Sequence, residues 1–352
     1  MNVVSRHDLE TAIASLMKSA SIFEPVEEII PMRAGGNNRT YCIETSSARY
    51  VVKHYFQHKG DKRDRLQSEY AFLGYAEQAE VAAVPCSLAQ DPQSGMALYE
   101  YIAGEAIQSG EIGQAEVDAA IMFFLALNEP TARKAAEKLP QASEAAFSLH
   151  EHLENTEHRI RQLQQIVLVD EEDHKGAIVI QSIATFWGEY RNRVLEAVNH
   201  LGWRVDESIA CDQRCISPSD FGFHNAIRSQ NDGLVFHDFE YFGWDDPVKL
   251  ISDFSHHAAM SLSNQLEQLW FSGVSTIYGK HLLNRLSAAW PLYGLNWCLI
   301  ILNEFKDEVW NRRCAADERK LNQRELHLST QLAKSKSKLD NLAISYKNKH
   351  YW

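Results

Sequence analysis

The segment "CISPSDFGFHNAI" (215–227) holds Asp220 and, five positions later, Asn225, with a glycine, two phenylalanines and a histidine between them. A second segment, "VFHDFEYFGWDDP" (235–247), adds Asp238. Burial of a carboxylate among apolar neighbours costs free energy unless it has a partner, so we look for one function that would explain all of these polar side chains. Phosphoryl transfer would explain them, because it requires a carboxylate at the attacking hydroxyl and oxygen ligands for magnesium. We therefore expect Asp220 to orient a hydroxyl and Asn225 and Asp238 to bind Mg²⁺.

A lysine with a glutamate partner precedes these segments. Lys53 lies in the apolar run "YVVKHY", where the alternation of a strand places Val51 and Tyr55 on its own face. A lysine on a buried face needs an anionic partner, and Glu69 on the following helix is the candidate. An ion pair of no functional consequence explains the two residues equally well when they are taken alone.

A glycine pair lies between two predicted strands, at Gly35-Gly36 before Asn37. Glycine lets the backbone approach phosphate oxygens, and asparagine tolerates a turn. An ordinary hairpin would have the same sequence.

Each of these motifs alone can arise by chance, as a capping aspartate or a simple turn. Their order along the chain, however, favours a binding site for a nucleoside triphosphate.

The first hundred residues have the pattern of an antiparallel sheet with one helix inserted. The segment 28–56 predicts strand, glycine loop, strand, turn and strand, and 84–104 predicts two more strands around a D-P-x-x-G turn. Between them, 61–78 predicts a helix. A short helix at 8–18, capped by Asp8, leads the chain.

Beyond Gly104 the pattern becomes helical, which predicts an α+β fold with two lobes. We expect a small antiparallel, β-rich nucleotide-binding lobe at 1–104, a larger helical lobe at 105–313 and a C-terminal helix and tail at 314–352. The predicted helices span 111–127, 131–166, 176–201, 247–261, 263–289, 291–313 and 314–346. The last has a leucine stripe that favours packing on the body over a coiled coil; its members are Leu321, Leu328, Leu332, Leu339 and Leu342.

Composition narrows the class of protein. The 352 residues are 45% hydrophobic and 23% charged, with a formal net charge of −12, which argues against a nucleic-acid binder. The segment 312–349 is locally basic, with ten Lys/Arg against four Asp/Glu. No secretory signal is evident and no apolar run approaches the roughly 20 residues of a membrane helix. The six cysteines fit free thiols. We expect a cytoplasmic protein with no membrane partner; its oligomeric state stays open.

The two polar segments resemble those of the aminoglycoside phosphotransferase and choline kinase superfamily, the small-molecule branch of the protein-kinase-like fold. The resemblance covers about residues 25–310 by the order of elements and is strongest at "SPSDFGFHN" and "HDFEYFGWDDP". It implies ATP as donor, Mg²⁺, and a hydroxyl of a sugar, amino alcohol or aminoglycoside-like acceptor. Asp220 then matches the catalytic aspartate. "LYEYIAG" resembles the interlobe hinge, where backbone groups of Glu100 and Ile102 would bond adenine.

The chain departs from the family pattern H-G-D-x-x-x-x-N at its first two positions. Pro218 stands in place of the histidine and Ser219 in place of the glycine. Proline can fix the backbone of the loop, and Ser217 or Ser219 can provide the missing hydrogen bonds. The change leaves an alternative open, a catalytically inactive nucleotide-binding pseudokinase or scaffold whose basic C-terminal helix binds a partner.

Several neighbouring residues have weaker claims. Glu240 fits a second metal or substrate contact as well as a surface residue. Asp246 and Asp253 are expected to cap the helix after the loop, and His256 and His257 to be ordinary helix residues.

Three residues of the last third of the chain could line the acceptor pocket. They are Trp297, Asn303 and Glu304, in "NWCLIILNEF". A buried helix with a polar end explains them equally well.

Overall fold

A five-stranded antiparallel sheet forms the N-terminal part of the computed structural model, with its strands in the order β1-β2-β3-β5-β4. The structure describes residues 5–32, 38–55, 63–200, 202, 204–231 and 233–347. The strands are β1 (Glu28–Pro31), β2 (Arg39–Glu44), β3 (Arg49–His54), β4 (Ser87–Asp91) and β5 (Met96–Glu100). Alternating apolar residues thus form the predicted sheet. The predicted glycine loop (Gly35, Gly36 and Asn37) lies outside the described residues.

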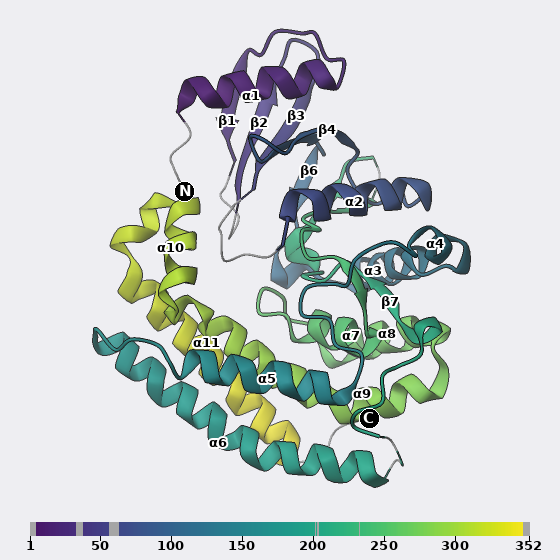
Figure 1. Ribbon diagram of the computed structural model, residues 1–352, viewed down its shortest axis with the longest axis vertical. Coiled ribbons are helices and arrows are strands. Elements are labelled where there is room, and N and C mark those ends of the chain that lie inside the picture. The colour runs from purple at the N-terminus through teal and green to yellow at the C-terminus, as the bar shows by residue number, and fades with distance from the viewer. Residues whose placement is uncertain are drawn as a thin grey trace.

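Two helices cover the two faces of this sheet (Figure 1). They are α1 (Arg6–Ser19) and α2 (Arg65–Gln78). Ile13 and Leu16 of α1 pack in one apolar cluster with Val52 and Leu98, whereas the alternate side chains of β3 and β5 belong to the cluster that includes α2. The alternation of β3 therefore places Lys53 on the side of α2, as expected.

The cap of α1 differs from the prediction. The Oγ of Ser5 accepts a hydrogen bond from the backbone N–H of Asp8 at 3.1 Å, so Ser5 is the N-cap and the helix begins at Arg6. The expectation that Asp8 caps a helix at 8–18 is wrong by about one turn at the start.

Two small ladders connect the polar segments to the rest of the molecule. β8 pairs with both β6 and β9, and β7 pairs with β10. Their bounds are β6 (Gly104–Ala106), β7 (Cys215–Ser217), β8 (Ala226–Ser229), β9 (Gly233–Phe236) and β10 (Gly243–Asp245). A Cβ at Gly104 would lie 2.3 Å from the Arg228 carbonyl oxygen, so only glycine allows this close pairing. The chain thus enters the helical lobe as strand β6, which pairs with the hairpin of β8 and β9.

Helices build the larger lobe around α9, which contacts α5, α6, α7 and α11 (Figure 1). The bounds are α3 (Gln114–Leu127), α4 (Pro130–Ala135), α5 (Leu149–Leu163), α6 (Glu171–His200), α7 (Pro247–His256), α8 (Asn264–Val274), α9 (Gly279–Ile301), α10 (Asp307–Ala316) and α11 (Arg324–Lys347). One apolar cluster joins α2, α3, α7 and α8, and another joins α5, α6, α9 and α11.

Several predicted helices are wrong in extent, and the predicted helix 263–289 is divided between α8, which ends at Val274, and α9, which begins at Gly279. The segment 131–166 is broken between α4 and α5, because Gln141 forms a parallel bridge to Trp244 and the capping box of Ser148 and Glu151 starts a new helix. The predicted break before Pro291 is absent, and α9 continues through it. Trp290, Leu292 and Tyr293 around it are buried, so tertiary packing overrides the unfavourable proline.

The predicted last helix (314–346) corresponds mainly to α11, which begins only at Arg324, because residues 314–316 end α10 and Glu318–Asn322 forms a 3-10 turn between the two helices. Leu328, Leu332 and Leu342 are buried in the cluster with α6 and α9, and Leu339 packs against it, as the stripe predicted. Leu321 precedes α11 and is 61% exposed, so it does not belong to the stripe. Within the described ranges, no helix combines the length and apolar character needed to cross a bilayer.

Candidate active site

Lys53 is held between two carboxylates from different parts of the chain. Its Nζ lies 2.5 Å from Glu69 Oε2 on α2 and also forms an ion pair with Asp238 Oδ1, after β9. Lys53 and Glu69 are buried, and the Tyr55 hydroxyl donates to Glu69 Oε2 at 2.7 Å. The structure thus brings together three residues that the sequence analysis selected from segments far apart.

Opposite charges fix the protonation of Lys53. Burial alone would lower its pKa, but Asp238 and Glu69 raise the pKa well above its usual range. Burial raises the pKa of Glu69, and Lys53 opposes that effect. A permanent cation therefore lies at the junction of the two lobes.

The backbone at Asp238 has an uncommon conformation. Its φ is +69°, which costs a non-glycine residue free energy and is often found at functional sites. The preceding residue, His237, donates its backbone N–H to the Asn225 carbonyl oxygen at 2.9 Å. The turn after β9 is thereby tied to the loop that carries Asn225.

The loop from β7 to Asn225 is closed by two local hydrogen bonds. The backbone N–H of Ser219 donates to Ser217 Oγ at 3.0 Å, and Asn225 Nδ2 donates to the Asp220 carbonyl oxygen at 3.0 Å. Ser219 has φ +57°, the left-handed region that favours glycine, the residue of the family pattern at this position. Of the two serines considered as substitutes beside Pro218, Ser217 is the one whose side chain supports the loop.

Two histidines surround the Asp220 carboxylate. Asp220 Oδ1 lies 3.1 Å from His257 Nε2 and 3.6 Å from His224 Nε2. Burial would raise the pKa of Asp220, but the interactions with the two nearby histidines lower it well below its usual range. The prediction that His257 is an ordinary helix residue is therefore wrong. His224 was not among the predicted site residues, because the spacing of the histidines in the sequence gives no signal of this contact.

Glu240 connects the two lobes. It is 1% exposed, and its carboxylate accepts from Asn38 Nδ2 at 2.7 Å and from Arg65 Nη1 at 2.5 Å. Both oxygens are therefore engaged by residues of the N-terminal lobe. This arrangement contradicts the interpretation of Glu240 as a surface residue and occupies the oxygens that a second metal would need.

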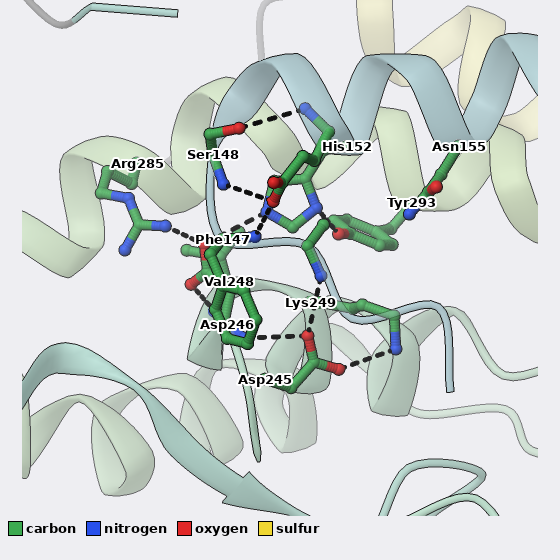
Figure 2. A network of polar contacts seen from close by, with 12 residues as sticks. Phe147, Ser148, His152, Asn155, Asp245, Asp246, Val248, Lys249, Arg285 and Tyr293 are labelled. Carbon is green, nitrogen blue, oxygen red and sulfur yellow. Dashed lines mark hydrogen bonds and ion pairs between the residues drawn. The ribbon is translucent and has the colours of Figure 1, made fainter. Parts of the chain in front are cut away.

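Asp246 is the predicted N-cap of α7 and also the centre of a buried network (Figure 2). Its Oδ1 accepts from the Val248 N–H at 2.9 Å, while Oδ2 contacts Arg285 and lies 3.1 Å from His152 Nε2. Burial lowers the pKa of His152 to about 3, so its ring is neutral at pH 7. The Tyr293 hydroxyl contacts the other ring nitrogen, and the network joins α5, α7 and α9.

The expectation that Asp253 is a helix cap is wrong. Asp253 lies within α7, where its Oδ1 accepts from Trp297 Nε1 at 3.0 Å and its Oδ2 lies 3.3 Å from Lys249 Nζ. Neighbouring Asp245, whose pKa burial raises to about 6, also binds Lys249, at 3.0 Å. α7 thus directs charged side chains both into the network and toward the cavity beside it.

A cavity of about 630 Å³ receives the polar residues from both segments. Asp220, Asn225 and Asp238 lie on its wall. The wall also includes Asp253, His257, Trp297, Asn303 and Glu304, from α7, α9 and the turns that follow them. From sequence alone, the last three residues could either line a pocket or form the polar end of a buried helix. They do both, because they lie at the end of α9 and in the turn after it, and they line the cavity.

The two hinge residues lie at the end of β5, on a different cavity of about 310 Å³. The backbone N–H of Glu100 donates to the Cys86 carbonyl oxygen at 3.0 Å, within the sheet. The adenine contact implied by the resemblance therefore depends on the Glu100 carbonyl group and on Ile102.

Comparisons with known proteins cover both polar segments of this site. The model of the phosphotransferase enzyme family matches residues 28–279, which include both polar segments. No curated protein matches the chain in sequence.

Several solved structures share the fold at low sequence identity. Choline kinase from Cryptosporidium parvum Iowa II has 13% identity and a TM-score of 0.58, with 92% of this chain and 99% of that chain covered. Choline kinase from Streptococcus pneumoniae has 16% identity and a TM-score of 0.55, with 88% and 98% covered. A spectinomycin phosphotransferase in complex with ADP and spectinomycin has 10% identity and a TM-score of 0.60, with 94% and 98% covered. The chain therefore belongs to the phosphotransferase enzyme family and has the two-lobed α+β fold of protein-kinase-like small-molecule kinases, as its sequence predicts.

Proposed function

We propose that this small-molecule kinase transfers the γ-phosphoryl group of ATP to a hydroxyl group of its acceptor, with Asp220 orienting that hydroxyl. The observation that carries the proposal is the shared cavity: Asp220, Asn225 and Asp238 all line it, and Lys53 binds Asp238 at its edge. A base, oxygen ligands and a phosphate-binding cation are thus available to one reacting group.

The donor would lie between the lobes. The fixed charge of Lys53, braced by Glu69, suits the phosphates, and the backbone of Gly35, Gly36 and Asn37 would cover them. Adenine would bond the hinge at Glu100 and Ile102. In many kinase-like sites such positioning and charge neutralisation supply most of the catalysis.

The residues present fit a magnesium ion. Asn225 donates from Nδ2 to the Asp220 carbonyl group, which leaves its Oδ1 as an oxygen ligand. Asp238 binds Lys53 through Oδ1, and its side chain is 33% exposed, so Oδ2 can serve as the second ligand. A bound Mg²⁺ would neutralise charge that develops on the phosphates.

The proposed step balances without a further reactant. The acceptor oxygen forms a bond to the γ-phosphorus while the bond from that phosphorus to the β,γ-bridging oxygen breaks, and ADP leaves. The Asp220 carboxylate, whose strongly lowered pKa keeps it ionised, accepts a hydrogen bond from the hydroxyl and orients it, and the acceptor proton passes to an oxygen of the transferred phosphoryl group and from there to solvent.

The test is a screen of hydroxyl-bearing metabolites (sugars, amino alcohols and aminoglycosides) for an ATP-dependent mass gain of one phosphoryl group. We expect Asp220→Ala to reduce transfer by about 10²–10⁴-fold. Calorimetry should show nearly unchanged Mg·ATP affinity, because Asp220 does not contact the donor. Asp206→Ala, a change at an exposed aspartate that forms a surface ion pair with Arg204, is the control.

Equal transfer by wild type and Asp220→Ala would refute the role of Asp220. Mg·ATP binding with no transfer to any acceptor or to water would instead support the inactive pseudokinase.

A further inference from the structure

His257 directs its ring at the proposed catalytic carboxylate. α7 ends at His256, and the chain turns at His257 with φ −57° and ψ 131°, which takes its side chain away from the helix axis. The residue is 7% exposed, and its Nε2 lies 3.1 Å from Asp220 Oδ1. A buried ring in this position is a direct neighbour of the reacting groups without lying among the proposed metal ligands.

The other ring nitrogen shows where the proton lies. His257 Nδ1 accepts a hydrogen bond from the backbone N–H of Ala259 at 3.1 Å. A backbone N–H can only donate, so Nδ1 must present its lone pair. Burial lowers the pKa of His257, which favours the neutral ring, and a neutral ring with a free Nδ1 carries its proton on Nε2. The Nε2–H therefore donates to Asp220.

Aromatic neighbours hold the ring in this orientation. The ring of His224 stacks on it with centroids 3.8 Å apart and planes 15° apart. Trp297 meets it edge-on at 4.2 Å, and the Trp297 indole is itself anchored to Asp253. The imidazole is thus confined from both sides, and the proton on Nε2 has a fixed direction.

A metal site is the main alternative for these side chains. Ligand atoms of Asp220, His224 and His257 lie within 4.8 Å of one another. A metal on His257 Nε2 would need the lone pair there, however, and would move the proton to Nδ1. That proton would face the Ala259 N–H, donor against donor. The observed hydrogen bond therefore favours an organic role over a metal.

We propose that His257 is a positioning residue that holds Asp220 by Oδ1 and leaves Oδ2 for the hydroxyl of the acceptor. The inference rests on the proposed function, because it needs Asp220 to act on a hydroxyl. In this chain the loop lacks a histidine before the aspartate, where Pro218 stands, and the support comes instead from the residue that follows α7.

The test compares three variants in Mg·ATP hydrolysis, where water takes the place of the acceptor. His257→Phe keeps a flat ring but removes both hydrogen bonds, and we expect kcat to fall about tenfold to a hundredfold. The Mg·ATP Kd from calorimetry should stay within about twofold, since no donor contact is lost. His257→Gln restores a donor near the position of Nε2 and should recover part of kcat.

His256→Phe is the matched control. The neighbouring histidine contacts the Trp290 carbonyl oxygen and does not touch Asp220, so its loss should leave kcat almost unchanged. If His257→Phe hydrolysed Mg·ATP at the wild-type rate, the positioning role of His257 would be refuted and the proposed function would be unaffected. A wild type that neither binds nor hydrolyses Mg·ATP would refute the proposed function instead.

Nitrogen-15 NMR of the wild-type protein gives a readout that does not depend on activity. Two-bond correlations of the wild-type histidines at neutral pH should show a neutral His257 with its proton on Nε2. A proton on Nδ1, or Zn²⁺ binding that is lost in His257→Gln, would overturn the inference in favour of the metal site.

Discussion

At the scale of single residues, Lys53 is the one on which most of the site depends. It faces two carboxylates, Glu69 and Asp238, in a buried environment where each charge is costly without the others. Donor phosphates would add negative charge next to it, and a bound magnesium ion would offset that charge. In the proposed site, the ion pair with Glu69 would fix the direction of the ammonium group, and Asp238 would remain able to bind the metal through its second carboxylate oxygen.

Replacement of Lys53 separates its structural from its binding role. Lys53→Met leaves two carboxylates without their cation and should lower the free energy of unfolding by about 3–5 kcal/mol. The double variant Lys53→Met/Glu69→Gln removes one of these charges and should recover much of that stability. Neither variant should bind Mg·ATP with wild-type affinity. Denaturant unfolding and calorimetry measure the two effects, and wild-type affinity in the double variant would contradict the assignment of Lys53 to the phosphates.

The sequence was sufficient to select candidate site residues that stand out from their immediate neighbours along the chain. Lys53 is found because it interrupts an apolar strand, and Asp220 and Asn225 because they share one loop. His257 and Glu240 could not be assigned, because their partners come from distant segments: Asp220 in one case, Asn38 and Arg65 in the other. Charge on an isolated side chain does not reveal which distant charge it meets.

At the scale of elements, α7 connects the buried network to the active-site cavity. Its N-terminus is fixed by Asp246, and its C-terminal end leads into His257. A shift at the cap would therefore move the positioning residue as well as the helix.

The N-cap of α7 should contribute more to the free energy of unfolding than an ordinary N-cap does. Asp246→Ala removes the bond to Val248 and also leaves the buried guanidinium of Arg285 without its carboxylate, so we expect a loss of about 3–5 kcal/mol in unfolding free energy. Ser263→Ala, at the exposed N-cap of α8, should cost only about 1 kcal/mol. Thermal or urea unfolding of the pair measures the difference. Similar losses in both variants would mean that the network adds no stability.

Element boundaries were predictable only where local chemistry decides them. The strands before residue 56 follow from alternation, and α2 begins after Asp64, its N-cap, close to its predicted start. The break after α4 depends on a bridge between Gln141 and Trp244, about a hundred residues apart, and α9 passes Pro291 because its surroundings are buried. Tertiary contacts of this kind leave no periodic signal in the sequence.

At the scale of the whole molecule, the two lobes are linked by charge as well as by the chain. Glu240 binds Asn38 and Arg65, and Asp238 binds Lys53. The segment after β9 is therefore tied by side-chain contacts to the N-terminal sheet and to α2. The cavity wall includes Trp297, Asn303 and Lys334, which lie beyond the residues that match the family model. We therefore expect selection of the acceptor to depend in part on residues outside the matched range.

The Glu240 link can be weakened without changing side-chain volume. Glu240→Gln removes the negative charge opposite buried Arg65 and should cost about 1–3 kcal/mol of stability. The Mg·ATP Kd should also rise, because the donor binds between the lobes that Glu240 holds together. Glu157→Gln, at a surface ion pair with Arg191, should change both quantities little. Unfolding and calorimetry would contradict this account if the two variants behaved alike.

Helix α11 supplies Gln331 and Lys334 to the wall of the cavity, although it is the last helix of the described chain. A ribosome must therefore synthesise the chain through α11 before the wall of this cavity is complete. Nascent chains could form the five-stranded sheet early, but the cavity could close only after α11 has emerged. Termination of synthesis before α11 would leave the cavity wall incomplete and the apolar cluster of α6 and α9 uncovered.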